Sequence, residues 1–345
     1  MSAKTRREDL DRAKGLGILL VVIGHIVARD SPTGNEWYVA LKNAIYLFHM
    51  PFFMYLSGYT TFMTRSAYLP MNEWPTLVSK RAKRLLLPLL VFGMTIVAGK
   101  LLLGTILHID NRPGTLIDAV YQLIWDTDLS PAGSIWYIAV LFILCVVTPP
   151  LLELLHNRAY VLFAIALVLY FVPVPHVMYL DRAATFYVFF MIGGLAAEST
   201  DRWMNFVDRT DWLFGGILAA AIGSCFFLFT TAYSEPIYWL GSDSGRIALL
   251  TCGCLSIPAL HGLVRRPFAA RSTFLIVLGT YSFVIYLLNT PSIGVAKGVM
   301  WHFADWNGAR FLVYAPVLLV TGIAGPILIK RLLLTRVRAL DTITS

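Results

Sequence analysis

Two ionisable side chains on the first apolar segment have the spacing that chemistry inside a membrane would need. Lys14 stands at the start of this segment, and His25 follows eleven residues later. Eleven steps of 100° bring two side chains to within about 20° of one helix face, about 16 Å apart along the axis. A neutral imidazole at that depth can take a proton from a hydroxyl, whereas a structural histidine would only bond a neighbouring helix. The spacing alone leaves both interpretations of His25 open.

A second histidine, His49, lies in the next apolar segment, within Phe48-His49-Met50-Pro51. A rise of about 1.5 Å per residue, counted from opposite faces of a ~30 Å core, predicts nearly the same depth for His25 and His49. Two imidazoles at one depth suit a proton-handling pair, and they equally suit a structural hydrogen-bonded pair. Pro51 is expected to kink the helix beside His49 and to open space there.

Arg81 and Arg84 precede the third apolar segment and, being three residues apart, share a helix face. Two guanidinium groups at a helix entry can bind phosphates in forked geometry. The plainer interpretation is a positively charged anchor on the cytoplasmic side of the membrane, and the spacing alone favours it.

Two further residues are candidates for contacting a substrate. Trp136 stands in Ile135-Trp136-Tyr137 at the start of the fourth apolar segment, where a Trp–Tyr pair is usually part of an interfacial belt. Asn289 ends a run of polar groups along the ninth segment, which either lines a cavity or bonds helices together.

The elements that must position these residues are membrane-spanning helices. Of the 345 residues, 57% are hydrophobic and 14% are charged, and the mean hydropathy is +0.68. A soluble domain carries about 25% charged residues, so a water-soluble core is excluded. The four cysteines lie in apolar runs without metal-ligand or redox spacing, and no motif for a metal or for nucleic acid is present. We predict an all-α polytopic membrane protein of about ten spans, forming a single domain over residues 1–345. The spans are roughly 13–29, 40–63, 84–107, 134–152, 159–175, 183–198, 211–230, 245–264, 273–295 and 311–334.

Lysine and arginine residues set the expected orientation. The net charge is +8, and the positive residues gather at both chain ends and in alternate connections, whereas the connection near 108–133 is acidic. Positive connections stay cytoplasmic, so both termini are predicted to be cytoplasmic. With ten spans the two termini fall on one side, as this charge pattern requires.

These residues together resemble the membrane-bound acyltransferases of the type-3 family, the bacterial O-acetylases of cell-surface glycans. The resemblance is carried by Lys14-x10-His25, by the segment from Phe48 to Tyr59, by Arg81-x-x-Arg84 and by Ile135-Trp136-Tyr137. It extends over the whole chain and is strongest over residues 8–92. The branch that includes fucose O-acetylases and exopolysaccharide acetyltransferases is the most similar. That branch often ends its ninth span with Ile-Tyr-Leu-x-His, where this chain has Asn289.

The resemblance implies transfer of an acetyl group from cytoplasmic acetyl-CoA to a sugar hydroxyl, in the bacterial inner membrane. Membrane lipids and a glycan or undecaprenyl-linked sugar acceptor are the expected partners. His25 is expected to act as the general base, with an acyl-His intermediate as the alternative that the sequence leaves open, and His49 is expected to be a second catalytic residue. Acetyl-CoA is expected to be bound by Lys14, Arg81 and Arg84, and the acceptor by Trp136 and Asn289. Two alternatives stay open, namely a proton-coupled transporter or flippase of lipid-linked sugars and a structural scaffold in which His25 has no chemical role.

Overall fold

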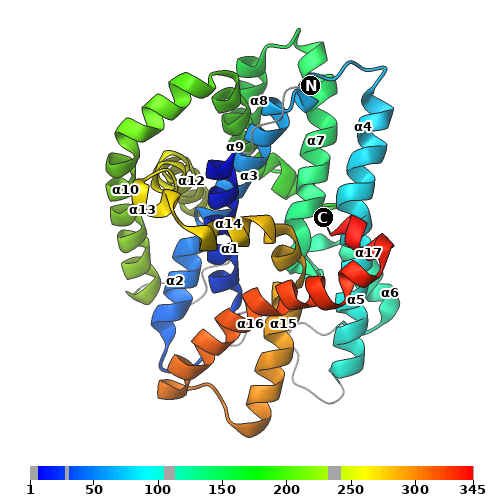
Figure 1. Cartoon of the computed structure of the whole chain (residues 1–345), viewed down its shortest axis with the longest axis vertical. Helices are drawn as coiled ribbons and strands as arrows, with labels where there is room; N and C mark the ends of the chain where they lie inside the picture. The colour runs from blue at the N-terminus through cyan, green and yellow to red at the C-terminus, as the bar shows by residue number, and fades with distance from the viewer. Residues whose placement is uncertain (1–6, 28–30, 105–112, 232–241, 345) are drawn as a thin grey trace.

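The computed structural model describes residues 7–27, 31–104, 113–231 and 242–344, and these residues form helices and connections without a strand (Figure 1). The α-helices are α1 (Glu8–His25), α2 (Glu36–Tyr46), α3 (His49–Met63), α4 (Trp74–Arg81), α5 (Leu87–Leu103), α6 (Leu116–Ile124), α7 (Trp136–Leu154), α8 (Ala159–Phe171), α9 (Leu180–Glu198), α10 (Thr200–Thr231), α12 (Asp243–Leu263), α13 (Pro267–Ala270), α14 (Thr273–Thr280), α15 (Ser282–Phe303), α16 (Phe311–Leu332) and α17 (Arg338–Ile343). The all-helical prediction is confirmed over these residues.

Within the described ranges, seven helical stretches are long and apolar enough to cross a membrane. The other three predicted spans also contain helix, but each departs from a simple span. The first half of α1 carries five charged residues, the second predicted span is interrupted between α2 and α3, and α8 has only 13 residues. The count of ten spans and the cytoplasmic position of both termini therefore stay predictions.

Helix α1 lies at the centre of the fold, and α2, α3, α12, α14, α15 and α16 all contact it (Figure 1). Glycine allows the closest of these contacts. A Cβ atom at Gly15 of α1 would overlap the carbonyl oxygen of Leu275, and one at Gly279 of α14 would overlap that of Asp11. Small residues let helix backbones approach in this way inside a membrane. The helix that carries Lys14 and His25 is thus held from several sides.

The second predicted span consists of two helices, because the helix is interrupted immediately before His49. Helix α2 ends at Tyr46 and α3 begins at His49, so the expectation of one kinked helix is wrong in this detail. Pro51 is the third residue of α3, in the first turn, where a missing backbone N–H breaks no intrahelical bond. The carbonyl oxygen of Ile45 accepts from the side chain of His49 at 2.8 Å and from the backbone N–H of Phe48 at 3.1 Å, so two hydrogen bonds hold the junction between α2 and α3.

Candidate active site

A cavity of about 350 Å³ lies between α1, α3, α7, α15 and the helices that carry Arg81 and Arg84. Its lining includes charged residues at one end, of which Arg84 is exposed and Arg81 half-buried. Met50 and Tyr286, each 6% exposed, line its buried part. A ligand in this cavity would therefore pass from a charged mouth to an enclosed, largely apolar interior.

The mouth brings together all three residues that the sequence predicts to bind the donor. Lys14, Arg81 and Arg84 line the same cavity, against the single carboxylate of Asp11. Residues Ala82–Leu86 form a π-helical segment between α4 and α5, a local widening that is frequent at functional sites. Arg81 is the last residue of α4, and Arg84 lies within this segment. The mouth therefore carries an excess of positive charge.

Arg81 and Arg84 differ from Arg265 and Arg266 in their contacts with acidic side chains. Arg265 and Arg266 each form an ion pair with an aspartate. Over the ranges that the structure describes, neither Arg81 nor Arg84 makes a hydrogen bond or an ion pair. A guanidinium group without a carboxylate partner is available for an external anion, and a phosphate is the anion that its fork fits best.

His25 contacts Asn289, the residue that stands where the related branch often has histidine. The distance between His25 Nδ1 and Asn289 Oδ1 is 2.7 Å. The amide nitrogen of Asn289 donates to the carbonyl oxygens of Ile285 and Tyr286, at 2.8 and 2.9 Å. Because carbonyl oxygens only accept, the amide can adopt only one orientation, with its oxygen toward His25. His25 must then carry its proton on Nδ1, which leaves a free lone pair on Nε2.

The buried end of the cavity reaches the level of this His25–Asn289 pair. Tyr286 precedes Asn289 by three residues on α15, a rise of about 4.5 Å, and so shares its helix face. Met50 directly follows His49 at the start of α3. Neither His25 nor His49 is among the lining residues, but residues less than one helical turn from Asn289 and His49 are. The cavity thus extends from the cationic mouth to residues that are close in sequence to His49 and Asn289.

His49 has the same tautomer as His25. Its Nδ1 donates to the carbonyl oxygen of Ile45, so its Nε2 is also free to accept a proton. Tyr46 connects the two histidines indirectly, because its ring lies 5.1 Å from that of His49 and its hydroxyl donates to the carbonyl oxygen of Gly24. The predicted proton-handling pair of His25 and His49 stays a prediction, because each imidazole bonds a different partner.

Trp136 is placed differently from the other predicted residues. It does not line the cavity. The centre of its ring lies 5.0 Å from that of Phe186 and 5.2 Å from the guanidinium carbon of Arg182. Its predicted contact with the acceptor stays a prediction. The neighbouring Tyr137 does line the cavity and lies 2.5 Å from the hydroxyl of Ser57.

The sequence analysis missed Ser57, Tyr137 and Tyr286 as members of the cavity, although all three fall within segments that it had singled out. Hydroxyl-bearing residues are common in membrane helices, where they bond neighbouring helices. Their type alone therefore does not separate a lining residue from one that joins two helices.

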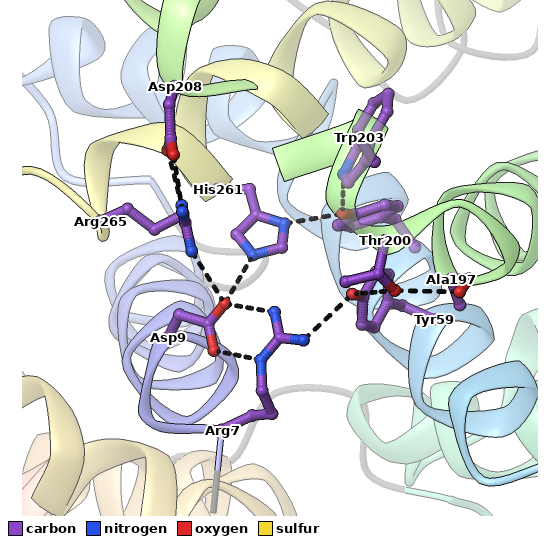
Figure 2. Close-up of polar contacts among 10 residues, drawn as sticks. Arg7, Asp9, Tyr59, Ala197, Thr200, Trp203, Asp208, His261 and Arg265 are labelled. Carbon is purple, nitrogen blue, oxygen red and sulfur yellow. Dashed lines mark hydrogen bonds and ion pairs between the residues drawn. The ribbon is translucent and has the colours of Figure 1, made fainter. Parts of the chain in front are cut away.

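A polar network around the buried His261 fixes the N-terminal end of α1 (Figure 2). Asp9 lies 2.7 Å from Arg7, 3.5 Å from Arg265 and 3.6 Å from Nε2 of His261. His261 is fully buried and bonds the hydroxyl of Tyr55 through Nδ1 at 2.7 Å. Burial by itself would raise the pKa of Asp9, but hydrogen bonds from His261 and Arg7 hold it well below the ordinary range. Asp9 is therefore ionised, and through His261 it ties α1 to α12 and to Tyr55 of α3.

Comparison with known proteins shows which family the chain resembles. A family model described as an acyltransferase domain matches residues 7–331. The chain is 29% identical over 344 residues to the nodulation protein NolL of Mesorhizobium japonicum, covering 92% of this chain and 84% of the relative. It is 27% identical over 256 residues to the NolL protein of Sinorhizobium fredii, covering 72% of this chain and 65% of that relative. No solved structure matches the chain.

Proposed function

Because the chain belongs to the membrane-bound acyltransferase type-3 family, we propose that it transfers an acetyl group from acetyl-CoA to a hydroxyl of a glycan or an undecaprenyl-linked sugar. Membership makes the protein an acyltransferase with membrane-spanning helices. The donor, the acceptor and the residues that act on them belong to the proposal. So does its location in the bacterial inner membrane, with the donor bound from the cytoplasm.

The donor assignment is supported by the unpartnered guanidiniums at the cavity mouth. CoA carries its phosphates at one end and its thioester at the other, joined by a long, thin arm. A cavity of about 350 Å³ is at the small end of the 300–1,000 Å³ usual for ligand pockets. It suits the arm better than the nucleotide, so the phosphates would stay at Arg81 and Arg84, at the mouth. The arm would then carry the acetyl group toward the level of His25.

The base assignment rests on the hydrogen bond between His25 and Asn289, and this observation carries the proposal. A sugar hydroxyl is a poor nucleophile until a base removes its proton. Asn289 accepts from Nδ1 of His25 at 2.7 Å and so holds Nε2 in its basic form. A third residue that fixes the tautomer of a catalytic histidine is a recurring feature of acyl transfer. In this account Asn289 positions the base, which revises its predicted role as a contact to the acceptor.

In the proposed reaction, Nε2 of His25 takes the proton of the sugar hydroxyl as the oxygen attacks the thioester carbonyl carbon. The tetrahedral intermediate then collapses, the carbon–sulfur bond breaks, and His25 returns the proton to the thiolate of CoA. The products are an O-acetylated sugar and free CoA. His49, with its own free Nε2, would act from the neighbouring helix on the same group of reactants.

The test is acceptor-dependent turnover by the purified protein. Acetyl-CoA labelled in the acetyl group is incubated with the protein in lipid vesicles and with glycan and lipid-linked sugar fractions from the host membrane. We expect release of free CoA in step with the appearance of label on the sugar. Movement of lipid-linked sugar across the vesicle without any consumption of acetyl-CoA would instead favour the flippase and contradict the proposal.

A further inference from the structure

Tyr286 combines features that none of the predicted catalytic residues has. It lines the buried part of the cavity, is only 6% exposed, and lies three residues before Asn289 on α15. Its hydroxyl oxygen accepts a hydrogen bond from the backbone N–H of Tyr137 at 3.0 Å. The hydroxyl thus lies at the start of α7, and Tyr286 stands on the same helix as Asn289, the residue that bonds His25.

The proton of this hydroxyl has no acceptor in the part of the chain that the structure describes. A phenol can donate one hydrogen bond as well as accept, and the contact with Tyr137 uses only its accepting capacity. The hydroxyl of Tyr137 is already engaged with Ser57 at 2.5 Å. A buried donor without a partner is unfavourable, so an acceptor brought by a ligand is the natural partner of the Tyr286 hydroxyl.

The position of the hydroxyl also makes it a suitable donor to a developing negative charge. Tyr137 is the second residue of α7, so its N–H is one of those left without an intrahelical acceptor at the helix start. The positive end of the dipole of this 19-residue helix therefore faces the Tyr286 oxygen. A hydroxyl that accepts from such a group is polarised, and its own proton becomes a stronger donor.

We propose that Tyr286 is a catalytic residue whose hydroxyl donates to the thioester carbonyl oxygen and stabilises the oxyanion that forms on attack. The inference rests on the acetyl transfer proposed above. The carbonyl π electrons move to the oxygen as the sugar oxygen bonds to carbon, and Tyr286 keeps its proton throughout. When the carbonyl re-forms, the carbon–sulfur bond breaks and His25 protonates the thiolate. One stretch of α15 would thus carry the oxyanion donor, Tyr286, and also Asn289, which holds the base His25 on the neighbouring α1.

Replacement of the hydroxyl alone tests this role. Tyr286→Phe keeps the ring that packs 5.5 Å from Tyr137 and removes only the donor. We expect kcat to fall about 10²–10³-fold, the loss usual for one oxyanion donor, with little change in the KM for acetyl-CoA. Tyr187→Phe is the matched control, because Tyr187 is a buried tyrosine on α9 that bonds Thr148 and lies outside the cavity lining. It should retain the wild-type kcat.

A second substitution covers the case in which Tyr286→Phe does not fold. Replacing Tyr286 by fluorotyrosine keeps the hydroxyl and makes it a stronger donor, so kcat should change with the number of ring fluorines. A kcat that is unaffected by either substitution would overturn the inference. If such variants are active and His25→Ala is inactive, Tyr286 is not the donor but the acetyl transfer stands. If His25→Ala is also fully active, the proposed mechanism itself has failed.

Discussion

The sharpest prediction concerns the two arginines at the cavity mouth. Replacing Arg81 or Arg84 by alanine removes a guanidinium group that has no partner within the described part of the protein. No internal ion pair is broken, so the loss falls on the ligand rather than on the fold. A hydrogen bond to a charged group contributes about 1.5–3 kcal/mol. That corresponds to a roughly ten- to hundredfold weaker affinity for acetyl-CoA in either variant.

The lysine variants and a neighbouring control separate phosphate binding from membrane anchoring. Arg81→Lys and Arg84→Lys keep the charge and lose the fork, so they should recover only part of the affinity. Lys83→Ala removes the same charge from the same π-helical segment, but Lys83 is exposed and does not line the cavity. It should leave the affinity unchanged.

The assay is equilibrium binding of acetyl-CoA to purified protein, repeated with the dephosphorylated donor. The wild type should prefer the fully phosphorylated donor, and the variant that loses this preference identifies the arginine at the missing phosphate. Equal affinity in all the arginine variants, or full recovery by lysine, would refute the reasoning and leave only an anchor.

Three further predictions follow from the same structure. In Asn289→Leu, His25 loses the partner that fixes its tautomer, so kcat should fall by up to the roughly 10²–10⁴-fold that a general base supplies. The affinity for acetyl-CoA should not change, and steady-state kinetics measures both quantities. Asp9→Asn should lower the free energy of unfolding by about 1–3 kcal/mol at neutral pH in thermal or denaturant unfolding. Folding lowers the pKa of Asp9, so its stabilisation is complete above the ordinary carboxyl pKa of about 4 and is lost as the pH falls below it; the variant should lack that acid-side decline. A cysteine at Gly114 should react with an impermeant reagent from outside the cell and one at Asn72 should not, and the reverse would invalidate the orientation.

Local patterns in the sequence were enough to predict the charged half of the site. The prediction of Lys14 and His25 depends only on the helical period, and that of Arg81 and Arg84 on their short spacing beside an apolar run. The structure brings Lys14 and the two arginines to one cavity, and it pairs His25 with Asn289. The choice of Lys14, His25, Arg81 and Arg84 as candidates needed no knowledge of how distant helices pack, whereas these contacts between helices did.

The remaining features depend on contacts between residues far apart in the chain. Asn289 bonds His25 only because α15 packs on α1, although the two residues are 264 positions apart in the chain. The carbonyl groups that orient the Asn289 amide therefore affect His25 only in the folded protein. The break before His49 was missed because its neighbours Leu47 and Phe48 are as apolar as a continuous helix would require. Tyr286 became a candidate only through its contact with the start of α7, which no pattern within either segment predicts.

The most direct test of the account is the rate of acetyl transfer by His25→Ala in a single turnover with donor already bound. His302→Ala serves as the control, because His302 is an exposed histidine on α15 outside the cavity lining. If His25 is the base, His25→Ala will bind acetyl-CoA with wild-type affinity and transfer the acetyl group at least about a hundredfold more slowly, while His302→Ala will be unaffected. Transfer by His25→Ala at a rate close to that of the wild type would contradict the assignment of His25 as the base.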